Sequence, residues 1–169
     1  MSQRIELSGI GQELVRADRN DGPLILWRWW ESGGRRDVGG LRRVIAGVWM
    51  MAEWPTSALG VALWVEMFRA AGFVSDTGEP KPALPWTVYR GTVWGRRRGM
   101  SWTTDLERAR WFAARYAVRH RDGLVFAVDV EPSAVLALVG DPGGRNESEV
   151  VVDLALLPTI GRRSVVSDS

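Results

Sequence analysis

Residues 145–153 read Arg-Asn-Glu-Ser-Glu-Val-Val-Val-Asp. A loop rich in Gly and Pro precedes this stretch and three valines lie within it, which predicts a loop that enters a buried strand. Side chains two residues apart in a strand share a face and lie roughly 7 Å apart, so Glu147 and Glu149 should project together. Such a pair suits chemistry in which one carboxylate stabilises developing positive charge and the other handles a proton. The alternative is an exposed strand start with solvated charges.

Composition limits the classes of site that the chain can form. The chain has 169 residues, a formal net charge of +2, no cysteine and a single histidine. Disulfides, thiolate chemistry and a multi-histidine metal site are therefore excluded, and we expect no metal. We find no signal pattern and no apolar run of transmembrane length, so the sequence predicts a cytoplasmic protein that does not enter a membrane.

The first half of the chain has helical periodicity. Apolar residues recur at helical spacing from Leu41 to Ala52, and a second helix is predicted from Ala58 to Ala71, with Thr56 or Ser57 as its cap. The ten tryptophans are scattered, which favours core and pocket packing over a repeat. A Pro-rich connector follows, so we divide the chain into an N-terminal helical segment, 1–80, and a core, 81–169, that together form one compact unit.

The second half changes to short strands around one helix. We predict strands at 86–91, 101–103, 124–130 and 135–139, and a last strand before the polar tail that begins at Arg162. A helix that Thr104 or Asp105 caps should run to about Arg119. Arg90 shares a face with Val88, so it should face the interior or a cleft and need an anionic partner. Gly91 allows another backbone or a ligand to come close.

Three arginines, 96–98, stand between two glycines in the loop that follows Gly91. They are interpreted either as a solvated loop or as a contact to an acidic protein surface or to nucleic acid phosphates.

Three short motifs stand in order along this half of the chain. They are Tyr89-Arg90-Gly91, Ser101-Trp102-Thr103 and Glu147-Ser148-Glu149. Together they resemble the arginine–serine–glutamate branch of the ADP-ribosyltransferases over roughly residues 85–160. The middle motif reads Ser-Trp-Thr where the family has Ser-Thr-Ser. The resemblance implies an α+β protein, with an ADP-ribosyltransferase-like split β-sandwich core preceded by the helical segment.

The resemblance also implies a role for each matching residue. The cofactor-binding set would hold NAD, which serves as a substrate; its members are Arg90 at the diphosphate or the ribose side, Gly91, Ser101 beside the catalytic glutamate, and Thr103 as a buttress of the cleft. Glu149 would stabilise the oxocarbenium-like state as nicotinamide leaves, because a negative charge is placed where positive charge develops. Glu147 would orient or deprotonate the acceptor. The loop that carries Arg145 and Asn146 would meet that acceptor.

The activity implied is mono-ADP-ribosyl transfer from NAD, with protein arginine as the acceptor that Glu147 favours and a nucleic acid base as a second option. Small enzymes of this kind occur in phages and as bacterial toxins or effectors, which is analogy only. Three alternatives stay open: an NAD glycohydrolase with water as the acceptor, a binding module that keeps the fold without catalysis, and a hydrolase of another glycosidic bond.

Overall fold

The computed structural model describes residues 9–120, 122–140 and 149–166. Over these residues the chain is a mixed α+β protein, which confirms the predicted class at that level. It divides into two compact units, residues 1–74 and 75–169, at the start of the Pro-rich connector. Each unit is described by itself below.

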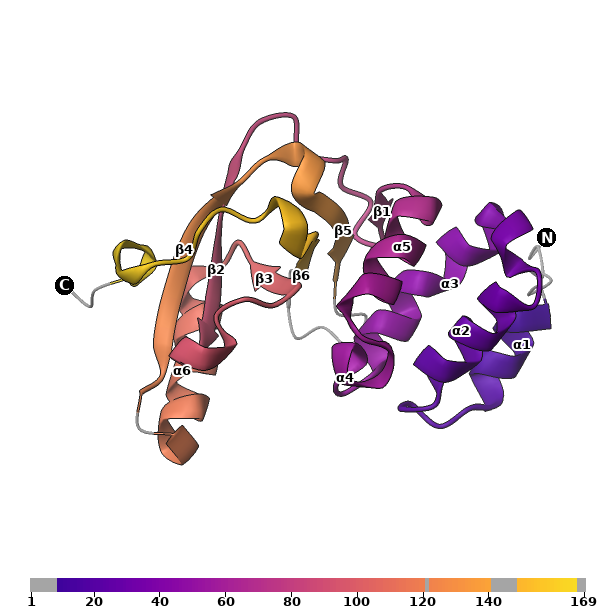
Figure 1. The fold of residues 1–169 in the computed structure, drawn as a ribbon, viewed down its shortest axis with the longest axis horizontal. Coiled ribbons are helices and arrows are strands. Elements are labelled where there is room, and N and C mark those ends of the chain that lie inside the picture. Colours follow the sequence, from indigo (N-terminus) through magenta and orange to yellow (C-terminus); the bar gives the residue numbers. More distant parts are fainter. Residues whose placement is uncertain (1–8, 121, 141–148, 167–169) are drawn as a thin grey trace, which may run out of the picture. The chain divides into compact units, whose positions relative to one another are not determined.

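Helices fill the first unit (Figure 1). They are α1 (Gly9–Arg16), α2 (Gly22–Glu31), α3 (Val38–Met51), α4 (Pro55–Leu59) and α5 (Val61–Ala71), with a 3-10 turn, η1, at Gly34–Arg36. The centre is aromatic: the rings of Trp49 and Trp64 meet edge to face at 5.0 Å, and Phe68 lies 5.7 Å from Trp49. Trp64 and Phe68 are completely buried, so these tryptophans have the packing role that their scatter predicted.

Two details of the helix boundaries differ from the prediction. The helix predicted from Ala58 to Ala71 is broken at Gly60, which has a positive φ of 77°. The preceding helix starts at Pro55, with Trp54 as its N-cap and no side-chain capping bond, so neither Thr56 nor Ser57 caps it. A proline at the first helical position loses no helical hydrogen bond there, and this explains the earlier start.

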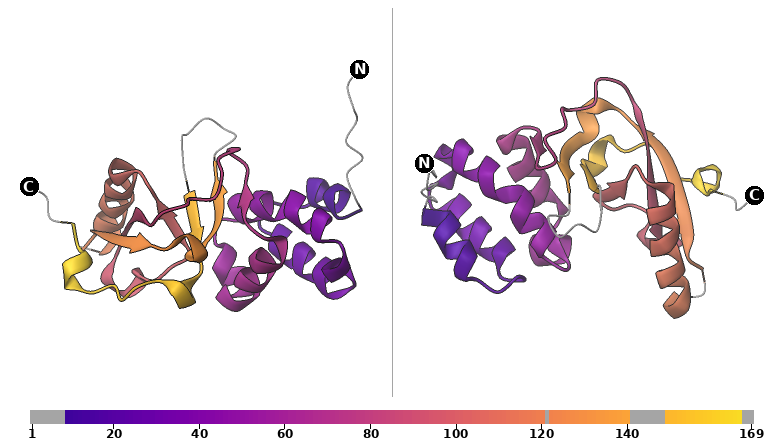
Figure 2. Two further views of the ribbon diagram at one scale, coloured as in Figure 1. Left: turned by 90° about the horizontal axis from the view of Figure 1, so that it is seen from above. Right: turned by 180° about the vertical axis from the view of Figure 1, so that it is seen from behind.

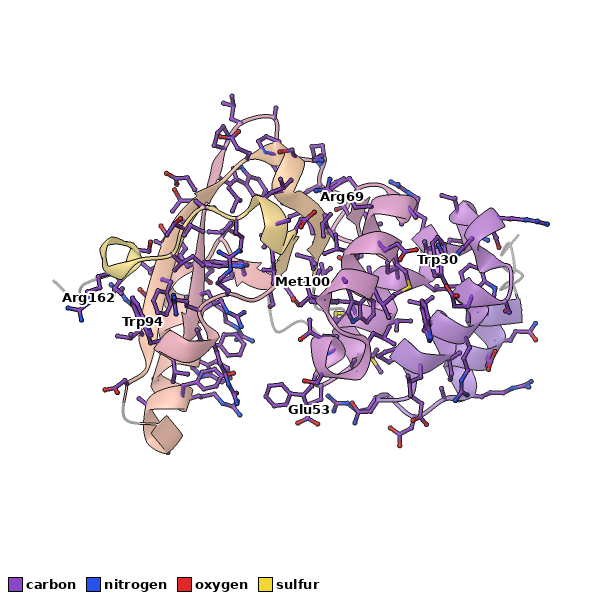
Figure 3. All side chains as sticks on the ribbon, in the orientation of Figure 1. Trp30, Glu53, Arg69, Trp94, Met100 and Arg162 are labelled. Carbon is purple, nitrogen blue, oxygen red and sulfur yellow. The ribbon has the colours of Figure 1, made fainter. Side chains whose placement is uncertain are left out.

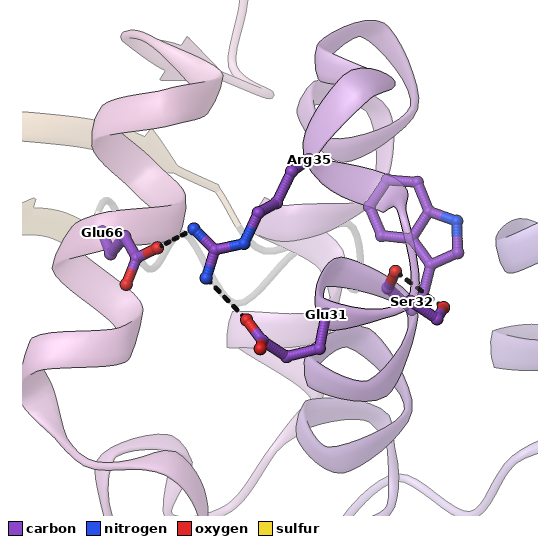
Figure 4. A network of polar contacts seen from close by, with 5 residues as sticks. Glu31, Ser32, Arg35 and Glu66 are labelled. Atoms are coloured by element: carbon purple, nitrogen blue, oxygen red, sulfur yellow. Dashed lines mark hydrogen bonds and ion pairs between the residues drawn. The ribbon is translucent and has the colours of Figure 1, made fainter.

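An exposed ion-pair network joins three elements of the first unit (Figure 4). Arg35 of η1 reaches Glu31 of α2 and Glu66 of α5, each at 2.5 Å. Two hydrogen bonds raise the pKa of Arg35 above its ordinary value. The bond to Glu31 has the larger effect and the bond to Glu66 the smaller one.

The second unit carries the sheet, whose strand order is β1-β5-β6-β3-β2-β4 over the described residues. Its strands are β1 (Val74–Ser75), β2 (Trp86–Thr92), β3 (Ser101–Thr103), β4 (Leu124–Val130), β5 (Val135–Val139) and β6 (Glu149–Val152). The pairs β2/β4, β2/β3, β3/β6 and β5/β6 are antiparallel.

Helix α6 (Leu106–His120) runs beside β2 and β4, as both views of Figure 2 and Figure 1 show. The predicted cap is present, because the Asp105 carboxylate accepts from the backbone N–H groups of Glu107 and Arg108. The inner side of the helix packs through Ala109 and Ala113 against Val125.

The predicted last strand is wrong. The segment after β6 forms 3-10 turns at Leu154–Leu156 and Arg162–Ser164, and a bridge between Phe126 and Val165 joins it to the sheet. Other contacts hold the segment. Arg97 donates to the Ile160 main-chain oxygen and Arg98 to that of Leu154.

Candidate functional site

The three motifs lie on neighbouring strands. Tyr89 of β2 pairs with Thr103 of β3, and Thr103 pairs with Glu149 of β6. Residues directly opposite each other in an antiparallel pair have side chains on the same face. Tyr89, Thr103 and Glu149 therefore form a row across three strands, although sixty residues of sequence separate the first from the last.

The Ser-Trp-Thr strand alternates as predicted. Ser101 pairs with Val151, two residues along β6 from Glu149, and thus shares the face of Thr103 and Glu149. Thr103 is buried, and its hydroxyl accepts from the backbone N–H of Asp105 at 3.1 Å. It therefore connects β3 to the start of α6. Trp102 points to the other face, where it is 2 % exposed and donates from its indole to the Gly99 oxygen.

Arg90 follows Tyr89 on β2 and is joined to the second motif by a hydrogen bond. Its Nη1 donates to the main-chain oxygen of Ser101 at 2.5 Å, and its Nε donates to that of Arg96 at 3.2 Å. The guanidinium also lies against Gly99, where an added Cβ would come within 2.5 Å of Nη2. The side chain thus bridges β3 and the arginine-rich loop.

The charge of Arg90 is in an unusual environment. Burial lowers the pKa of its guanidinium below the ordinary value, while Tyr116 and Glu149 act in the opposite direction and Arg96 lowers it further. Glu149 is therefore close enough to interact electrostatically with Arg90. The sequence predicts an anionic partner for Arg90. Glu149 acts on the guanidinium as such an anion, and the main-chain oxygens of Ser101 and Arg96 accept its hydrogen bonds.

Gly91 has a packing partner. A Cβ at this position would lie 1.8 Å from the main-chain oxygen of Ala109 in α6. The sequence left open whether a backbone or a ligand approaches this glycine, and the partner found is the helix backbone. The cofactor-binding role assigned to Gly91 is therefore not needed to explain why a glycine stands there.

The other predicted positions divide into two groups. Glu149 is the first residue of β6 and is partly buried. Glu147, Arg145 and Asn146 lie outside the described residues, so the expected pairing of Glu147 with Glu149 stays a prediction.

Two features at the site were missed by the sequence reasoning. The first feature is Tyr116 of α6, which is the first of the groups that raise the pKa of Arg90. The sequence contains no signal that brings this phenol near that guanidinium. The second feature is the structural use of Arg97 and Arg98, which the sequence placed in solvent or on a polyanion.

The chain was compared with protein-family models, curated proteins and solved structures, and no match was found in any of the three. Within the described part of the chain, no group of three or more acidic, histidine or cysteine side chains is arranged to hold a metal ion. No described helix combines the length and the apolar character needed to cross a membrane.

Proposed function

We propose that the second unit is an ADP-ribosyltransferase-like core that cleaves NAD at the bond between nicotinamide and ribose. The observation that carries the proposal is the row Tyr89–Thr103–Glu149, because it gathers the three motifs on adjacent strands in the order β2-β3-β6. Charge supports it too, since Glu149 and the Arg90 guanidinium interact.

In the proposed reaction, the bond between C1′ of the ribose and the nicotinamide nitrogen breaks, and neutral nicotinamide leaves with the bonding electrons. Glu149 stabilises the positive charge that develops on the ribose. The acceptor then bonds to C1′, and its proton passes to Glu147. Ser101 and Thr103 border Glu149 on the same face, while Arg90 interacts with the NAD phosphates.

The binding-module alternative is favoured by one observation. Arg90 uses its Nη1 and Nε donors on the Ser101 and Arg96 main-chain oxygens, as a structural arginine does. In this alternative the second unit retains the strand order but does not turn over NAD.

Nicotinamide release from NAD by the purified full chain tests the proposal. The wild type should release nicotinamide, and Glu149→Gln should lower the rate by about 10²–10³-fold, the usual loss when an electrostatic stabiliser of the transition state is removed. Glu131→Gln makes the same charge change at an exposed position of the same unit and should leave the rate unchanged.

The acceptor distinguishes transfer of ADP-ribose to a protein from hydrolysis of NAD by water. Release that needs an arginine-rich protein, and that labels it, identifies a transferase; the same rate in buffer alone identifies an NAD glycohydrolase. Equal nicotinamide release by the wild type and Glu149→Gln would refute the assignment of Glu149 to the site. If no acceptor led to nicotinamide release, the result would favour the binding-module alternative.

A further inference from the structure

The two sides of α6 have opposite chemistry. Its inner side carries Ala109 and Ala113, both buried, and the helix backbone there closely approaches Gly91 of β2 and Gly123, which precedes β4. Two large rings of the helix face outward instead: Trp111 is 45 % exposed and Phe112 is 37 % exposed. A helix that only covered a sheet would have this pattern reversed, with its bulky apolar groups inside.

Arginines are stacked on these exposed rings. The guanidinium carbon of Arg108 lies 4.8 Å from the ring centre of Trp111 and 5.3 Å from that of Phe112. Arg115 lies over Trp111 at 4.7 Å. The four residues recur at spacings of three and four and thus form one stripe along the helix, which we call the Arg–Trp stripe: Arg108, Trp111, Phe112 and Arg115.

Positive charge is concentrated on this helix. Its sequence contains four arginines against one glutamate, so α6 alone has a larger excess of positive charge than the whole chain, whose net charge is +2. The glutamate, Glu107, is ion-paired with Arg110, which lies outside the stripe. The positive electrostatic potential of the stripe therefore favours binding of a polyanion.

We infer that the Arg–Trp stripe binds single-stranded nucleic acid. The exposed parts of the aromatic rings provide surfaces on which unpaired bases stack, and the arginines that lie over the rings contact the phosphates and stack on bases in turn. An acidic peptide would use the two arginines but leave the exposed indole without a function. The stripe spans about two helical turns, or roughly 11 Å, which corresponds to a contact with two or three nucleotides. This surface is independent of NAD cleavage.

Fluorescence anisotropy with a labelled single-stranded oligothymidylate tests the inference on the full chain at low salt. We expect wild-type binding and a loss of affinity of about tenfold in Trp111→Ala, the usual effect of removing one stacked base. Trp111→Phe retains an aromatic surface and should recover most of the affinity. Arg108→Gln/Arg115→Gln should reduce the dependence of log affinity on log salt by about 0.7 for each phosphate that the protein no longer neutralises.

The control is Arg162→Gln, which removes one positive charge at an exposed position of the same unit, labelled in Figure 3. It should bind as the wild type does. Because Trp111 is exposed, circular dichroism should show a fold unchanged by its replacement.

Three results would overturn the inference. The first is absence of oligonucleotide binding by the wild type, and the second is equal affinity of the wild type and Trp111→Ala. The third is a preference for polyglutamate competitors or anionic lipid vesicles over the oligonucleotide, which would assign the stripe to an acidic protein or a membrane surface. None of these results depends on nicotinamide release, so failure of this inference and failure of the proposed activity are separable.

Discussion

Nη1 of Arg90 donates to the main-chain oxygen of Ser101, 2.5 Å away, and links the first motif to the second. A second bond from Nε to Arg96 holds the same side chain to the adjacent loop. The residue that the resemblance assigns to the NAD phosphates therefore also supports the sheet from which the site is built.

Arg90→Lys should accordingly reduce stability as well as NAD affinity. A lysine ammonium is compact and lacks the planar fork, so it cannot span both oxygens, and we expect a loss of about 2 kcal/mol in the free energy of unfolding measured with urea. Arg162→Lys, at an exposed site, is the control and should change little. Unchanged stability with lost NAD affinity would show that the guanidinium serves the ligand alone.

Gly91→Ala should destabilise the second unit. The new Cβ would fall 1.8 Å from the Ala109 oxygen, and backbone cannot yield as a flexible side chain does. We expect a loss of about 1–3 kcal/mol or a displaced α6. Gly95→Ala is the matched control, because no atom lies within 4 Å of its added Cβ. Similar unfolding curves for the two variants would contradict the close helix–strand packing.

Trp102→Thr changes the middle motif to Ser-Thr-Thr, which is closer to the Ser-Thr-Ser of the family that the chain resembles, but it should weaken the fold. The indole is 2 % exposed and donates to the Gly99 oxygen, so truncation leaves a large cavity and an unused acceptor. The expected cost is about 3–5 kcal/mol in chemical denaturation. Trp54→Thr removes an indole that is 58 % exposed and should cost far less. A tolerated Trp102→Thr would mean that the core of the second unit adapts to the smaller side chain.

Adjacent arginines of the 96–98 loop should differ in their effect on stability. Arg97 donates to the Ile160 and Trp94 oxygens and stacks on Trp94 at 4.5 Å, so Arg97→Ala should cost about 1–3 kcal/mol. Arg96→Ala, which removes an exposed side chain, should be nearly neutral. Thermal unfolding of both variants measures the difference, and equal melting temperatures would show that Arg97 does not hold the C-terminal segment.

The Arg35 network should be sensitive to salt. Arg35→Gln removes ion pairs to both Glu31 and Glu66, which are exposed, so the melting temperature should fall slightly in dilute buffer. The difference from the wild type should vanish near about 1 M NaCl, where the Debye length is roughly 3 Å. Arg36→Gln, the neighbouring exposed arginine, serves as the control. A difference that persists in high salt would indicate packing and not charge.

Local patterns in the sequence were sufficient to predict much of the second unit. The period-two and apolar runs predicted strands that the structure places at 86–92, 124–130 and 135–139. Asp105 was one of two predicted caps, Thr104 or Asp105, because capping depends on residues only two or three positions away. The alternation of Ser101, Trp102 and Thr103 follows from the same local geometry.

The sequence by itself thus determined most of the three strands at 86–92, 124–130 and 135–139 and which side chains of a strand share a face, because these properties depend on neighbours in the chain. Tertiary structure alone decided that Gly91 receives the Ala109 backbone, that Arg90 binds the Ser101 and Arg96 oxygens, and that the segment after β6 is held by arginines instead of forming a strand. It also decided that Trp111 of α6 faces outward. These features depend on atoms that are distant in the chain and meet only when strands and helices pack. The residue pattern of a single segment therefore does not predict them.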